Sequence, residues 1–223
     1  MVTVWLIRHG ESTSNAGLPS AEPTAMTQLT AKGQAQAEIL ARSLPQPNLI
    51  VTSPYLRSKQ TAQPLIQRFP NCPQTEWPVQ EFTYLPATIN QTTTHQERRK
   101  LREDYWEKCD PTCVMGEGAE SFAELIDRTR LMQSTIALLD PGLVLVFSHA
   151  VFIRAVLWVL LSPQIEMTAE GMQRFRMFIR AFRVPNGSIV KLQVQDGVVF
   201  SSGVLTSHLQ ESTLEPQLLN PLG

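Results

Sequence analysis

Short apolar runs recur along the chain, and longer segments of mixed apolar and polar residues stand between most of them. The runs cover residues 2–7, 48–52, 77–80, 143–148 and 188–194. Runs of this length predict strands, and the segments between them are typical of helices. Their alternation predicts an α/β fold whose mostly parallel sheet has helices on both faces. The Asp196-Gly197 pair after the last run indicates a hairpin, and therefore an antiparallel edge.

Three of the predicted helices have recognisable starts. Thr30 is an N-cap candidate, and Ser121 with Glu124 forms the pattern of a capping box. Ser53 and the proline after it predict the start of a third helix, with Arg57 in its first turn. A cation there is disfavoured by about 0.3 to 1 kcal/mol, because the helix N-terminus is already positive. Arg57 therefore indicates a negative group near this helix start.

Residues 143–161, "LVLVFSHAVFIRAVLWVLL", are about as long and as apolar as a membrane-spanning helix. Ser148, His149 and Arg154 interrupt the run, and its first part is rich in β-branched residues. The polar interruption falls where a buried parallel strand would pass into a buried helix. We therefore predict a strand followed by a helix, and no membrane partner.

Length and composition are those of an ordinary globular protein. The 223 residues are 43% hydrophobic and 17% charged, which predicts one domain with a real core. The net charge of −1 gives no overall attraction to nucleic acid, so any anion site must be local. The sequence does not indicate an oligomeric state.

The cysteines favour a reducing compartment. Cys72, Cys109 and Cys113 are an odd number, and the first residues form a predicted strand rather than a secretory segment. We expect a cytoplasmic protein. Cys109 and Cys113 lack a second Cys or His pair nearby that would complete a metal site, so we expect no metal.

Polar residues follow four of the predicted strands. Arg8 and His9 follow the first, His149 follows the strand at 143–148, Arg57 lies just after the strand at 48–52, and Glu81 follows residues 77–80. Taken singly, such a histidine is usually a hydrogen-bonded core residue, and such a charged residue is usually solvated. Ligands of open α/β sheets bind at the carboxyl ends of the strands, so these residues together predict a single anion-binding crevice.

The motifs around these residues resemble those of the histidine phosphatase superfamily, the fold of cofactor-dependent phosphoglycerate mutases and acid phosphatases. The resemblance rests on "RHGES" with Asn15, "LTAKGQAQA", "SPYLRSKQTA", "EFTYL" and "VFSHA", in that order over residues 2 to about 160. It implies a single three-layer domain, phosphoglycerate mutase-like, over residues 1–205. Within it, residues 82–119 would form a substrate-covering insertion, and residues 206–223 a loosely held tail.

The resemblance also implies a role for each candidate residue. His9 would be the nucleophile that becomes phosphorylated, and Glu81 the proton donor. Arg8, Arg57 and His149 would hold the transferring phosphoryl group, and Asn15 would be a further phosphate contact. Fixed positive groups suit phosphoryl transfer, and the arginines can bind the oxygens in bidentate fashion. No cofactor is expected.

Three functions stay open at this point. A metal-independent phosphomonoesterase acting on a small molecule is favoured, because residues 13–28 lack the "NxFxGWxD" pattern that mutases carry before the "LTxxG" helix. The alternatives are a cofactor-dependent phosphoglycerate mutase and a non-catalytic phospho-binding module. The identity of the phosphorylated substrate is also open.

A basic run follows in the least regular part of the chain. Arg98, Arg99, Lys100 and Arg102 are interleaved with acidic residues, which is typical of a solvated helix face. The alternative is that one or two of these arginines reach over the crevice and bind a distal anionic group of the substrate.

Overall fold

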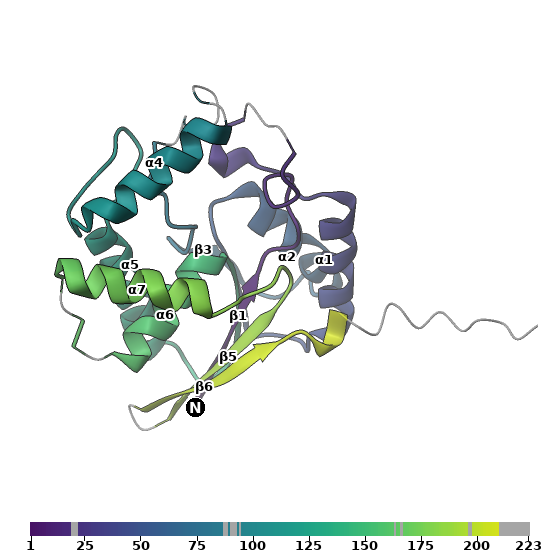
Figure 1. Ribbon diagram of the computed structural model, residues 1–223. Coiled ribbons are helices and arrows are strands. Elements are labelled where there is room, and N and C mark those ends of the chain that lie inside the picture. The colour runs from purple at the N-terminus through teal and green to yellow at the C-terminus, as the bar shows by residue number, and fades with distance from the viewer. Residues whose placement is uncertain are drawn as a thin grey trace, which may run out of the picture.

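A six-stranded sheet forms the centre of the fold, with the strand order β3-β2-β4-β1-β5-β6 (Figure 1). The computed structural model describes residues 1–18, 22–86, 89, 93, 95–162, 164, 165, 167–195 and 198–209. The strands are β1 (Val2–Arg8), β2 (Leu49–Thr52), β3 (Gln74–Glu76), β4 (Gly142–Ser148), β5 (Ile189–Gln195) and β6 (Val198–Leu205). The first four are parallel, and β5 runs antiparallel to both β1 and β6. The predicted α/β fold, mostly parallel with an antiparallel edge, is confirmed.

Helices cover both faces of the sheet (Figure 1). One face carries α1 (Ala31–Ser43) and α2 (Leu56–Arg68); the other carries α4 (His95–Lys108), α5 (Phe122–Ala137), α6 (Ala150–Leu161) and α7 (Ala169–Ala181). Side chains alternate between the faces along each strand. Ile7 and Phe147 therefore pack in the core beneath α1 and α2, whereas Leu6 and Val146 pack in the core beneath α5 and α6.

Local capping explains where two of the helices begin. The Thr30 hydroxyl accepts a hydrogen bond from the Gly33 N–H, and Ser121 with Glu124 forms a complete capping box. The prediction for Ser53 was wrong, because α2 begins at Leu56 after an N-cap residue without a side-chain cap bond. The Ser53 hydroxyl instead makes a long-range contact in the site described below.

The predicted strand at residues 77–80 was also misplaced. The strand is β3, Gln74–Glu76, whose three residues are exposed. It is an edge strand that pairs only with β2, and its sequence, Gln-Thr-Glu, contains no apolar residue by which it could be predicted. Val79, which suggested the strand, is buried in the core just after β3 ends.

Two glycines allow the loop after β1 to lie against the start of α1. A Cβ atom on Gly33 would stand 2.0 Å from the Glu11 carbonyl oxygen, and one on Gly10 would stand 2.4 Å from the Gly33 carbonyl oxygen. Real Cβ atoms do not come this close to backbone, so neither position accepts a side chain without a backbone shift. This contact fixes the chain directly after His9.

Much of the irregular segment at 82–119 is ordered, with residues 95–108 forming α4. The predicted tail begins at residue 206, and its first residues form the 3-10 helix η2 (Ser207–Leu209), where the His208 Nε2 donates to the Gly187 carbonyl at 2.8 Å. Residues 210–223 and the Asp196-Gly197 turn lie outside the described residues. Within the described ranges, no helix is long and apolar enough to cross a membrane.

Candidate active site

The ends of β1 and β4 bring two histidines together. Arg8 lies level with Ser148 in the parallel pair, and the His9 N–H donates to the Ser148 carbonyl at 3.0 Å. His9 and His149 therefore leave the sheet at the same edge, with ring centroids 5.0 Å apart. Their exposed fractions are only 2% and 0%, so both imidazoles are removed from bulk water.

The hydrogen bonds of His9 define its tautomer. The Nδ1 atom lies 2.6 Å from the Gly10 carbonyl oxygen, which can only accept, so Nδ1 carries the proton. Burial, followed by the charges of Arg57 and Arg8, lowers the pKa of His9 well below its usual range. The ring is therefore neutral, and the lone pair on Nε2 faces the Arg57 Nε at 3.1 Å. A neutral imidazole whose Nε2 carries a lone pair and no proton is the form that attacks phosphorus.

The charges of two arginines, which come from opposite faces of the sheet, act on His9. Arg57, in the first turn of α2, is 5% exposed, and its Nη1 donates to the Thr24 carbonyl at 2.8 Å. Arg8 is anchored by an Nη1 hydrogen bond to the Val184 carbonyl at 2.7 Å, while its buried Nε has no partner among the described residues. Burial lowers the pKa of Arg57 to about 10, so it stays cationic at neutral pH. The unpaired Arg8 Nε and the positive charges of Arg8 and Arg57 can together bind an anion.

His149 is held by the residue that the sequence had suggested as a cap. Its Nε2 lies 2.8 Å from the Ser53 hydroxyl, which also accepts from the Tyr55 N–H. Burial, then the charge of Arg57, lowers the pKa of His149 well below its usual range. Its Nδ1 is buried and has no partner among the described residues. That atom is therefore available to a ligand.

Glu81 lies at the N-terminus of α6. Its Oε1 accepts hydrogen bonds from the backbone N–H groups of Phe82 at 3.1 Å, Val151 at 2.9 Å and Phe152 at 3.3 Å. These donors anchor one carboxyl oxygen, because the first N–H groups of a helix have no intrahelical partner. The other oxygen, Oε2, makes no hydrogen bond to a described residue, so it is free to exchange a proton with a ligand.

A nearby ion pair holds the backbone that carries Glu81. The Arg128 guanidinium binds both oxygens of Glu120, at 2.9 and 2.7 Å, and also donates to the carbonyls of Pro78 and Gln80. Both partners are largely buried. No sequence pattern indicates this pair, because Glu120 lies in the loop before α5 and Arg128 lies within that helix.

Asn15 is exposed and lies at the rim of the cluster of residues around His9. Its Oδ1 accepts from the Asn186 Nδ2 at 2.9 Å, and Asn186 also donates to the carbonyls of His9 and Gly10. The Asn15 amide nitrogen makes no hydrogen bond to a described residue and can donate to a ligand. Sequence reasoning missed Asn186, whose pairing with Gly187 signals only a turn.

The charges of the site leave room for an anion. Arg8, Arg57 and Arg154 all feel the charge of Glu81, so three guanidinium groups share one carboxylate. The sequence marks Arg154 only as a charged residue within an apolar run, and predicts no place for it in the site. Within the described part of the chain, no three His, Cys, Asp or Glu side chains are grouped so that they could hold a metal ion. The site can bind a phosphoryl dianion next to a neutral imidazole.

Comparisons with known proteins identify the family of the chain. A model of the histidine phosphatase superfamily (branch 1) matches residues 4–201. A comparison of the sequence with curated proteins gives no match.

Solved structures share the fold. Alpha-ribazole phosphatase from Shigella flexneri matches with a TM-score of 0.68 and 23% identity over 92% of this chain and 96% of that chain. Phosphoserine phosphatase from Entamoeba histolytica, in complex with 3-phosphoglyceric acid, matches with a TM-score of 0.68 and 20% identity over 94% and 100%. A mycobacterial glucosyl-3-phosphoglycerate phosphatase matches with a TM-score of 0.66 and 23% identity over 90% and 97%.

Proposed function

The chain belongs to branch 1 of the histidine phosphatase superfamily, and from this we propose that it is a phosphomonoesterase that needs no metal and forms a phosphohistidine on His9. Its substrate is a small phosphorylated molecule, as the names of the structural neighbours suggest. The observation that carries the proposal is the neutral His9 ring, whose Nδ1 is held by the Gly10 carbonyl and whose Nε2 carries no proton and accepts from the Arg57 Nε.

In the first step, Nε2 of His9 attacks phosphorus and the bond from phosphorus to the ester oxygen breaks. Arg8 and Arg57 are the groups that bind the equatorial oxygens, because the transition state spreads negative charge over them. The Arg57 Nε, which donates to His9 in the structure, would turn its hydrogen bond to a phosphoryl oxygen. His149 would contribute its unpaired Nδ1 to the same oxygens in the tautomer that places the proton there.

The leaving alkoxide takes a proton from Glu81. Anchoring of Oε1 at the start of α6 leaves Oε2 as the oxygen that carries this proton. The carboxylate that remains then accepts a proton from water as the water oxygen attacks phosphorus. The bond from phosphorus to Nε2 breaks, its electron pair returns to the imidazole, and inorganic phosphate leaves.

The test is hydrolysis of p-nitrophenyl phosphate in the presence of a chelator. The wild type should turn over, and His9→Ala should lose activity while keeping its unfolding temperature. Acid-labile, base-stable phosphate should be trapped on the peptide that contains His9. Trapping on another residue, or activity that requires a divalent metal, would refute the mechanism.

Two other outcomes separate the alternatives. If the folded wild type is inert with this ester but isomerises 3-phosphoglycerate after priming with a bisphosphate, the protein is a mutase. If it binds phosphate esters without turning over any, it is a binding module. Both outcomes would overturn the phosphatase proposal.

A further inference from the structure

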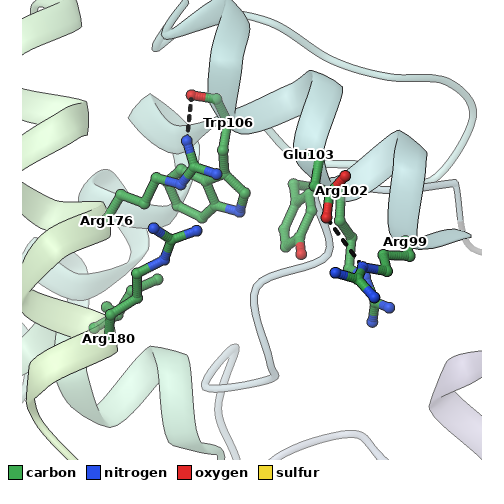
Figure 2. A pocket seen from close by; sticks show the side chains of 8 residues that line it. Arg99, Arg102, Glu103, Trp106, Arg176 and Arg180 are labelled. Carbon is green, nitrogen blue, oxygen red and sulfur yellow. Dashed lines mark hydrogen bonds and ion pairs between the residues drawn. The ribbon is translucent and has the colours of Figure 1, made fainter.

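A pocket of about 210 Å³ lies between α4 and α7 (Figure 2). Arg99 and Arg102 of α4 line it from one side, and Arg176 and Arg180 of α7 line it from the other. Glu103 is the one acidic residue in its lining. The pocket therefore collects positive charge in a chain whose net charge is −1.

Most of this charge is not balanced within the protein. Arg99 pairs with Glu103 at 3.1 Å, but Arg102 and Arg180 make no hydrogen bond or ion pair with any described residue. Arg176 reaches the Trp106 carbonyl only at 3.4 Å, and its buried Nε has no partner in the described part of the chain.

The arginines are also placed so that they repel one another. Arg99 and Arg102 are three residues apart on α4, and Arg176 and Arg180 are four residues apart on α7. Like charges at these spacings lie on one helix face and repel one another. A bound anion would offset this repulsion, so the arrangement favours a binding site over a solvated surface.

Aromatic rings complete the pocket. Trp106 and Tyr84 line it, with ring centroids 5.7 Å apart in an edge-to-face arrangement, and Arg176 lies 6.0 Å from the Trp106 ring. Tyr84 is itself stacked on Tyr105, with centroids 4.7 Å apart. Such a wall accepts a flat or apolar part of a ligand beside its anionic group.

Tyr84 connects the pocket to the site around His9. It is three residues from Glu81, and the charges of Arg102, Glu81 and Arg176 all act on its phenol, whose pKa is raised by burial. The Tyr84 ring centroid lies 5.1 Å from that of Phe82, whose backbone N–H donates to the Glu81 Oε1 at 3.1 Å. Direct contacts therefore link the wall of the pocket to the proton donor of the proposed reaction.

The sequence predicts a distal contact from one or two arginines of the basic run, and of these Arg99 and Arg102 line the pocket. The Arg98 guanidinium donates to the Thr93 carbonyl at 2.7 Å and does not line it.

We propose that the pocket between α4 and α7 binds a second anionic group, a phosphate or a carboxylate, of the same molecule whose phosphoryl group is transferred to His9. The inference rests on the proposed function and narrows its substrate class to phosphomonoesters with two anionic ends.

The test uses pairs of compounds that differ in one anionic group. The pairs are fructose 1,6-bisphosphate with fructose 6-phosphate, adenosine 3′,5′-bisphosphate with adenosine 5′-monophosphate, and 3-phosphoglycerate with glycerol 3-phosphate. Each compound is measured as an inhibitor of p-nitrophenyl phosphate hydrolysis by the full chain. At least one doubly anionic compound should inhibit competitively with a Ki at least tenfold lower than its partner, and the pairs show whether phosphate or carboxylate is preferred.

A double variant of the pocket and a matched control show whether the pocket causes the lower Ki of the doubly anionic compounds. Arg102→Gln/Arg180→Gln should bring the Ki ratio to about one, while KM for p-nitrophenyl phosphate changes less than twofold. The matched control, Arg42→Gln/Arg130→Gln, removes two exposed arginines of α1 and α5 and should keep the wild-type ratio. A ratio that survives in Arg102→Gln/Arg180→Gln, or no preference in any pair, would overturn the inference.

Failure of the proposed function gives a different result. If the wild type does not hydrolyse p-nitrophenyl phosphate, the same pairs are titrated calorimetrically into the intact protein. A tenfold preference in Kd that is lost in Arg102→Gln/Arg180→Gln supports the pocket without the reaction. Equal Kd values within every pair overturn it.

Discussion

Acidification should destabilise the protein through the two buried histidines. The pKa of His9 and of His149 is lowered well below the ordinary 6.5, with burial as the largest cause in both. The unfolded chain therefore binds more protons than the folded one below about pH 6.5, so this part of the stability is present above that pH and is lost as the pH falls. The proposed reaction needs the same neutral imidazole of His9 that contributes this part of the stability.

The size of the effect follows from the unfolded value. Each pH unit below the unfolded pKa is worth about 1.4 kcal/mol for a histidine that stays neutral in the fold. On going from about pH 7.5 to about pH 5, each ring thus lowers the free energy of unfolding by about 2 kcal/mol, and the two together lower it by about 4 kcal/mol. That is a large part of the 5 to 15 kcal/mol that is typical of a domain's stability.

Urea unfolding followed by tryptophan fluorescence measures this loss, in buffers without phosphate because phosphate would bind the site. Wild type should lose about 2 kcal/mol more than His9→Gln or His149→Gln over this pH range. His208→Gln, which removes an imidazole at η2, is the matched control and should follow the wild type. If all four proteins lose the same free energy, both rings ionise within the fold, and the reasoning about a neutral nucleophile fails.

Three further predictions concern single residues. Glu81→Gln should lower kcat by about 10² to 10⁴ for glycerol 2-phosphate but far less for p-nitrophenyl phosphate, whose leaving group needs no proton; an equal fall for both esters would contradict the role of proton donor. Gly33→Ala should destabilise by about 1 to 3 kcal/mol in thermal unfolding because its Cβ meets backbone, whereas Gly203→Ala, with open space around it, should not; equal losses would contradict this account. Arg128→Gln should cost about 3 kcal/mol in urea unfolding because it leaves the largely buried Glu120 carboxylate without its cation, and a loss below about 1 kcal/mol would show that the pair behaves like an exposed one.

The parts of the fold that the sequence predicts well are those where local and tertiary demands agree. The strands before His9 and His149 are buried on both faces, so their apolar runs are unambiguous. Thr30 and Ser121 satisfy nearby N–H groups, so their sequence pattern alone indicates the helix starts. These elements place the two histidines side by side, which is why their proximity could be predicted from the sequence.

The remaining parts depend on contacts that no local pattern records. Ser53 has a cap-like sequence context, but its hydroxyl is used by His149, 96 residues away. The edge strand β3 is polar because only one of its sides is paired. Arg176 and Arg180 look like an ordinary helix surface until α4 places Arg102 opposite them.

The sheet separates two apolar cores, and the arginines of the site belong to opposite sides of it. Arg8 is tied to Val184, which packs in the core beneath α5 and α6, whereas Arg57 lies on α2, which packs in the other core. An anion held by both guanidinium groups would be released if either side opened. Occupancy would then slow hydrogen exchange in both layers by the same factor, since local openings that break the site must first lose the ligand. Substrate or product would thereby make two structurally separate halves open as one cooperative unit.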